Sequence, residues 1–151
     1  MGLNFEKWHG NGNDFIIINS IENELKITRN KIIKISDRNI GIGFDQLIKI
    51  DLPTKPNHDF FIRFFNADGS EAGMCLNGIR CAAKYIWNNS FAPKGTVNFQ
   101  TKTKNIVCEP KAGNMIKVHI EPPDKIEHKS LYNKLKNKGV NNFFISNIGN
   151  N

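Results

Sequence analysis

A cysteine, Cys75, stands directly before a helix-like segment in the stretch GMCLNGIRCAAKYIW, residues 73–87. From residue 77 to about residue 87 the pattern predicts a helix that is apolar around nearly its whole circumference, which is typical of a buried helix. A thiol at a helix N-terminus meets unpaired backbone amides and the positive end of the helix dipole. Both effects favour thiolate over thiol, so the placement predicts that Cys75 is a usable base near neutral pH.

The same first-turn amides are suited to binding a carboxylate. A proton acceptor beside an anion site fits removal of a proton from the carbon next to a carboxylate. The alternative is that Cys75 is a small buried side chain, as most free cysteines are, and the residues alone leave both interpretations open. We expect Cys81, six residues into the helix, to belong to the protein core and Cys108 to be structural within a strand.

Metal and membrane chemistry have little support in the composition. The three cysteines form no C-x-x-C pair and the four histidines are scattered, so we expect no metal site. The longest apolar runs are strand-length, which argues against a membrane span. The N-terminus lacks a basic segment followed by an apolar core, so no secretory signal is expected, and free thiols indicate a reducing, cytoplasmic compartment.

The net charge of +7 has two interpretations. One is nucleic-acid binding. The other is a compositional bias towards Lys, Asn and Ile, and this is favoured because the lysines spread along the chain with only a modest cluster at residues 129–138. We therefore expect no nucleic-acid partner, and we keep a basic, non-catalytic binding module as an alternative function.

The remaining pattern predicts the elements that must position Cys75. A helix is expected at residues 28–39 with Thr28 as its N-cap, and turn chemistry (ADGSEAG) precedes Cys75. Residues 4–10 and 11–20 are expected to form a strand, a Gly/Asn turn and a second strand. Further strands are expected at residues 41–53 and 58–66, and two or three strands at residues 96–123. We expect an α+β fold in which a strongly curved, barrel-like antiparallel sheet wraps around a central helix.

Two prolines at positions 122 and 123 suggest a boundary. We expect an N-terminal domain at residues 1–121 and the start of a second domain at residues 122–151. The second segment is more polar and ends in an apolar strand, FFIS, at residues 143–146.

Three motifs, in this order, resemble the diaminopimelate epimerase family: KWHGNGNDFIIIN (7–19), DRNIGIGFDQLIKI (37–50) and FFNADGSEAGMCLNGIRCAAKYI (64–86). The similarity covers about residues 5–90 and weakens beyond. It implies cofactor-independent conversion of LL-diaminopimelate to the meso form, for lysine and peptidoglycan precursors, by two cysteines on opposite faces of the α-carbon. One cysteine removes the proton as a thiolate and the other delivers a proton as a thiol.

The resemblance also implies individual roles. Cys75 matches the family's first catalytic cysteine, and no cofactor or metal is implied. The substrate-binding positions that it implies are Asn13, Gln46, Asn66, Leu76, Asn77 and Asn150. The full-length family protein is expected to be a cytoplasmic homodimer. Its expected ligand is a small-molecule substrate, diaminopimelate.

This sequence departs from the family pattern in two ways. Leu76 replaces a glycine, and we expect it to narrow the carboxylate site or tilt Cys75. The chain stops at Asn151, before the family's second cysteine. It then represents a truncated or decayed copy, the front part of a longer chain, or a chain whose copies pair so that two Cys75 thiols face each other. A proline racemase-like isomerase and a purely structural fragment are kept as further hypotheses.

Overall fold

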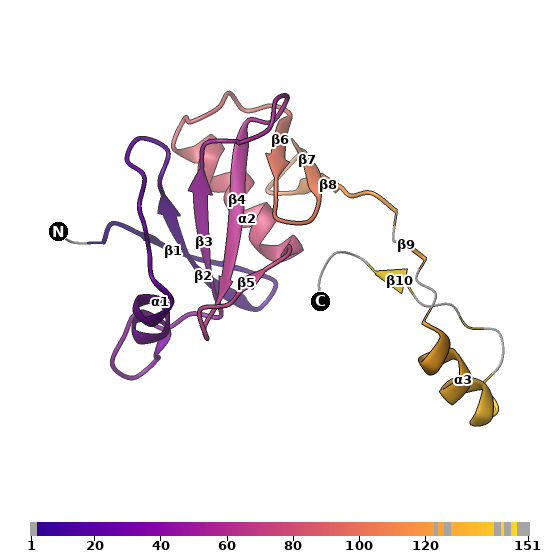
Figure 1. Cartoon of the computed structure of the whole chain (residues 1–151). Helices are drawn as coiled ribbons and strands as arrows, with labels where there is room; N and C mark the ends of the chain where they lie inside the picture. The colour runs from indigo at the N-terminus through magenta and orange to yellow at the C-terminus, as the bar shows by residue number, and fades with distance from the viewer. Residues whose placement is uncertain (1–2, 123, 126–127, 141–142, 144–145, 148–151) are drawn as a thin grey trace.

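The computed structural model describes the whole chain except residues 1–2, 123, 126–127, 141–142, 144–145 and 148–151. Its main body is an eight-stranded sheet that curves around helix α2, Leu76–Asn88 (Figure 1). The strands of this sheet are β1 Glu6–Gly10, β2 Asn13–Asn19, β3 Gln46–Asp51, β4 Phe60–Asn66, β5 Glu71–Ala72, β6 Val97–Gln100, β7 Asn105–Pro110 and β8 Ile116–His119.

The strand order is β1-β2-β3-β4-β6-β7-β8, with β5 paired to β4. The predicted α+β class and the curved sheet around a central helix are confirmed. The prediction of a wholly antiparallel sheet is wrong, because β2 pairs with β3, and β4 with β6, in parallel. Parallel neighbours need a crossover connection, and the two crossovers contain helix α1, Arg29–Ser36, and helix α2.

Helix α2 lies in the middle of the larger core. Its residues Ile79, Ala82, Ala83 and Ile86 are fully buried and pack with side chains from the concave face of the sheet, such as Phe64. This confirms the prediction of a helix buried on most sides. Burying one isoleucine side chain contributes about 2 kcal/mol, so packing rather than helix propensity holds α2 in place.

The other face of strands β2 and β3 packs against α1. Thr28 caps this helix, as predicted, and its hydroxyl oxygen accepts a hydrogen bond from the Lys31 amide at 3.3 Å. Alternate residues of β2 therefore enter two separate cores: Phe15 and Ile17 face α2, whereas Ile16 and Ile18 join the α1 cluster. A strand covered on both faces explains the uninterrupted apolar run FIIIN.

The segment after the two prolines forms helix α3, Lys129–Asn137, and a two-stranded pair, β9 Asp124–Lys125 with β10 Ser146–Asn147. Figure 1 shows α3 to one side of the main sheet, and none of its residues is buried. The sequence prediction did not include α3, and the predicted FFIS strand lies partly outside the described residues. No helix among the described residues is long and apolar enough to cross a membrane.

Candidate active site

Cys75 is the N-cap of α2. Its backbone is extended, with φ −142° and ψ 110°, and its Sγ accepts a hydrogen bond from the Gly78 amide at 3.4 Å. The short strand β5 pairs Ala72 with Phe64 and so returns the chain to the sheet just before the helix. Gly78 then allows the first turn to lie directly on β4, since a Cβ there would be 2.6 Å from Phe64 Cε1.

The protonation of Cys75 differs from the sequence expectation. Burial raises the pKa of the Cys75 thiol, while hydrogen bonds from the Gly78 and Asn77 amides and the charge of Arg80 act in the opposite direction. The predicted lowering by the helix N-terminus is therefore present but outweighed, because the half-buried thiol has lost much of its hydration.

The other two cysteines lie where they were predicted, Cys81 in the core and Cys108 within a strand, β7. Cys81 is 4% exposed and Cys108 is fully buried. Burial raises the pKa of Cys81 to about 11 and that of Cys108 to about 12. Neither thiol is placed to ionise near neutral pH, which leaves Cys75 as the partly exposed, helix-capping thiol of the chain.

Asn77 joins the first turn of α2 to the β1–β2 hairpin. Its Nδ2 donates to Asn13 Oδ1 at 2.8 Å, and its Oδ1 accepts from Arg80 and, at 3.5 Å, from Asn11. The hairpin comes this close because Gly10 has no side chain: a Cβ there would lie 3.0 Å from the Cys81 Sγ. The structure therefore brings Asn13 and Asn77, two of the predicted binding residues, into direct contact beside Cys75.

Gln46 and Asn66 form a second amide pair. They are register partners on β3 and β4, and Gln46 Nε2 donates to Asn66 Oδ1 at 2.8 Å. Gln46 also pairs with Phe15 on β2, two residues after Asn13. Asn13, Gln46 and Asn66 therefore lie at the same end of three neighbouring strands, the end on which the first turn of α2 packs.

Leu76 is the first residue of α2, and its side chain is partly buried against the core. A helical backbone suits leucine, so this position does not require the conformational freedom of glycine. Asn150, the last predicted binding residue, lies outside the described residues.

Sequence reasoning missed a charged cluster that supports the hairpin. Arg38 donates to both carboxylate oxygens of Asp14, at 2.7 and 3.0 Å, and to Asp45 at 2.9 Å. Asp45 in turn accepts from Asn13 Nδ2 at 3.3 Å. The Arg38 guanidinium holds the pKa of the Asp14 carboxyl well below its usual range, against burial and with help from Lys7. The signal available in the sequence was the position of Asp14 and Asp45 directly after the glycine-containing segments GNGN and GIGF.

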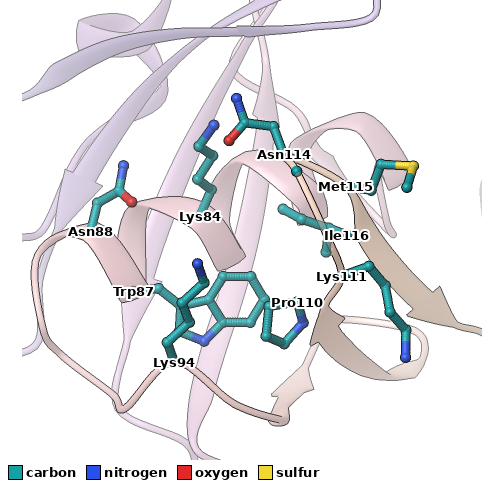
Figure 2. A pocket seen from close by; sticks show the side chains of 10 residues that line it. Lys84, Trp87, Asn88, Lys94, Pro110, Lys111, Asn114, Met115 and Ile116 are labelled. Atoms are coloured by element: carbon teal, nitrogen blue, oxygen red, sulfur yellow. The ribbon is translucent and has the colours of Figure 1, made fainter.

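A cavity of about 110 Å³ lies near the other end of α2 (Figure 2). Its lining includes Lys84, Lys94 and Lys111, whose side chains point in different directions in Figure 2, and Trp87. The lining contains no thiol or carboxylate, so it offers no acid–base pair. Within the described part of the chain, no cluster of His, Cys, Asp or Glu could hold a metal ion.

A curved sheet wrapped around a buried helix is a fold that this chain shares with solved structures. Methylitaconate-delta-isomerase superposes with a TM-score of 0.61 at 18% identity, over 74% of this chain and 35% of that one. A phenazine biosynthesis protein of the PhzF family from Bacillus anthracis gives 0.59 at 15% identity, over 83% and 43%. At this identity the similarity establishes the fold alone.

The family follows from sequence comparison. The family model described as diaminopimelate epimerase matches residues 5–126. The diaminopimelate epimerase of Acinetobacter baylyi is 38% identical over 130 residues, 85% of this chain, and that of Blochmanniella floridana is 40% identical over 121 residues, 80% of this chain. The chain belongs to the diaminopimelate epimerase family, a family of isomerases.

The chain spans less than half the length of these two relatives, 46% and 44% respectively. The activity, substrate and partners of the relatives are therefore carried to this chain only as proposals.

Proposed function

We propose that this chain forms one half-site for the cofactor-independent epimerisation of LL-diaminopimelate to meso-diaminopimelate. In this proposal Cys75 exchanges the proton of the α-carbon. The observation that supports it most directly is the position of Cys75 at the N-cap of α2, with the Asn13–Asn77 contact beside it.

The Cys75 thiol alone is sufficient for exchange of the α-proton. The Cys75 thiolate takes the α-proton, so the C–H bond breaks, an S–H bond forms and the electron pair moves into the neighbouring carboxylate. The Leu76 backbone amide, at the start of α2, is suited to stabilise the negative charge that develops there. Return of the proton to the same face gives exchange with solvent, whereas inversion needs a second acid on the opposite face. In the family resemblance a second cysteine has that role.

Substrate binding is proposed for Asn13, Gln46, Asn66, Leu76, Asn77 and Asn150. The side chains of Asn13, Gln46, Asn66 and Asn77 each end in an amide, which can donate and accept hydrogen bonds without adding net charge. This suits a substrate that carries both ammonium and carboxylate groups. Leu76 would contribute its backbone amide at the start of the helix.

The raised pKa of Cys75 gives the proposal a pH dependence. In the free chain the thiol form dominates at neutral pH, and the thiolate fraction grows as pH rises towards the pKa. A substrate ammonium group near the sulfur would favour the thiolate and so oppose the effect of burial. We therefore expect proton exchange to become faster with increasing pH.

The test is incubation with LL-diaminopimelate in deuterated water, with deuterium at the α-carbon followed by mass spectrometry. Exchange by the wild-type chain, lost in Cys75→Ala and kept in Cys81→Ala, is the expected result. Cys81→Ala is the matched control because it removes a thiol from the same helix. A folded wild-type chain that gives no exchange above the buffer rate would contradict the proposal.

We also propose the domain organisation 1–121 and 122–151, a cytoplasmic location and, for a full-length family member, a homodimer. A small-molecule substrate is proposed rather than nucleic acid or membrane. The dispersed lysines support this choice, since those that line the cavity of Figure 2 diverge rather than form a common surface.

A further inference from the structure

Four amide side chains of the proposed site form two hydrogen-bonded pairs. In one pair Asn77 Nδ2 donates to Asn13 Oδ1 at 2.8 Å. In the other pair Gln46 Nε2 donates to Asn66 Oδ1, also at 2.8 Å. A half-turn of an amide group exchanges its oxygen and its nitrogen, and so exchanges an acceptor for a donor. A binding site built from amides therefore needs neighbours that fix their direction.

Asp45 fixes the direction of the first pair. Its Oδ2 accepts from Asn13 Nδ2 at 3.3 Å and from the Asp14 backbone amide at 3.1 Å. A carboxylate only accepts hydrogen bonds, so the Asn13 nitrogen has to face Asp45 and the Asn13 oxygen has to face Asn77. At the other end of the pair Arg80, which only donates, bonds to Asn77 Oδ1. The two ends agree, because a half-turn of either amide would set donor against donor and acceptor against acceptor.

Asp68 has the same effect on the second pair, through the hydroxyl group of Ser70. Asn66 Nδ2 donates to Ser70 Oγ at 3.0 Å, and Ser70 Oγ donates to Asp68 Oδ1 at 2.6 Å. Hydrogen bonds from the Ser70 hydroxyl and backbone amide hold the pKa of the Asp68 carboxyl below its usual value. The carboxyl is therefore ionised at neutral pH, and the Ser70 hydroxyl has to donate to it. The hydroxyl oxygen then accepts from the Asn66 nitrogen, which leaves the Asn66 oxygen facing Gln46.

We propose that Asp45 and Asp68 are positioning residues that fix the direction of the amides in the proposed site. Asp45 directly precedes β3, which begins at Gln46, and Asp68 follows β4, which ends at Asn66. Each carboxylate therefore stands beside the strand end that carries the amide it orients. The inference rests on the proposed function for its consequence in substrate binding. The direction of the amides can be measured without a substrate, so an inactive chain would still test it.

The experiment compares Asp45→Ala and Asp68→Ala with the wild-type chain, and each variant is the matched control for the other. Heteronuclear NMR follows the side-chain amide protons of Asn13, Asn77 and Asn66. Their signals are assigned from the peaks that disappear when each asparagine is replaced by alanine. Magnetisation transfer from water then gives the rate at which each amide exchanges its protons with solvent.

We expect Asp45→Ala to speed exchange at Asn13 and Asn77 by about tenfold and to leave Asn66 within about twofold of wild type. The acceleration is the order expected for loss of one hydrogen bond to a charged group. Asp68→Ala should do the reverse. Unchanged rates would overturn the inference, and so would equal acceleration at both pairs, because that result indicates a general loss of stability.

Two further measurements complete the test. If the wild-type chain exchanges the α-proton of diaminopimelate, Asp45→Ala should raise KM about tenfold and leave kcat within about threefold, since the amides bind and the thiol reacts. A fall in kcat alone would contradict the positioning role. If Asp45→Ala does not fold, Asp45→Asn replaces it. This variant keeps the size of the side chain but has one accepting oxygen in place of two, so exchange at Asn13 should still be about threefold faster, and an unchanged rate would overturn the inference.

Discussion

Gly78 is the position where the packing of α2 can be tested most directly. It is buried in the first turn of the helix, three residues after Cys75, and its backbone conformation is compatible with alanine. A Cβ at this position would lie 2.6 Å from Phe64 Cε1 and 3.3 Å from Ile48 Cδ1, where ordinary contacts begin at 3.4 Å. Gly78→Ala therefore forces either the helix or the sheet to move.

The size of the effect follows from the surroundings. Phe64 and Ile48 are both fully buried, so neither can turn towards solvent. Overpacking of this kind costs about 1–3 kcal/mol. The better helix propensity of alanine offsets at most about 1 kcal/mol. Because the Cβ would lie only 2.6 Å from Phe64, the cost lies in the upper part of that range. We expect a net loss of about 1–2 kcal/mol in the free energy of unfolding, or a fall in Tm of about 2–8 °C for a chain of this length.

Thermal unfolding followed by circular dichroism measures this effect, with Gly95→Ala as the matched control. A Cβ at Gly95 would meet nothing within 4 Å, and its φ is ordinary, so that variant should unfold within about 2 °C of wild type. If the two variants unfold at the same temperature, α2 does not pack on β4 as tightly as these distances require. The interpretation that Gly78 allows the first turn of α2 to lie directly on β4 would then be wrong.

Two further predictions concern charge and protonation. Arg38→Gln should make the free energy of unfolding less dependent on pH. Because the folded-state pKa of Asp14 is lowered, the pair stabilises the fold above the ordinary carboxyl pKa of about 3.9, and this stability is lost as pH falls towards the folded-state pKa. The urea midpoints at about pH 7 and pH 3 should therefore lie closer together in the variant. An unchanged separation would mean that the pair contributes nothing. At neutral pH a thiol reagent should label Cys75 well before Cys81 and Cys108, whose pKa values burial raises to about 11 and 12; mass spectrometry of the native protein checks the order, and equal rates would contradict the burial of the two.

The features predicted well from the sequence are those that local patterns determine. The apolar pattern predicts a helix at 77–87 and the helix is observed at Leu76–Asn88, because an apolar circumference leaves little choice but burial. The Thr28 cap is likewise predicted from a residue type at a helix boundary and is observed. Both depend on residues within a few positions of each other.

The features that were missed depend on distant residues. The parallel pairing of β2 with β3 follows from a crossover that no local pattern specifies. Arg38 and Asp14 are 24 positions apart, and Asp14 and Asp45 are 31 apart, so their contact follows only from the register of the sheet. The direction of the Cys75 pKa shift was wrong for the same reason, since burial is a property of the folded chain.

The opposing effects at Cys75 have a consequence for acid–base exchange. A thiol governed by burial alone stays protonated, and one governed by amides and a cation alone stays ionised; neither changes state readily. At Cys75 burial is opposed by the Gly78 and Asn77 amides and by Arg80, so an added positive charge shifts the balance towards the thiolate. A ligand ammonium would move the balance towards thiolate, and its departure would reverse it. Binding of such a ligand should therefore release a proton near neutral pH, and binding without proton release would show that burial alone governs this sulfur.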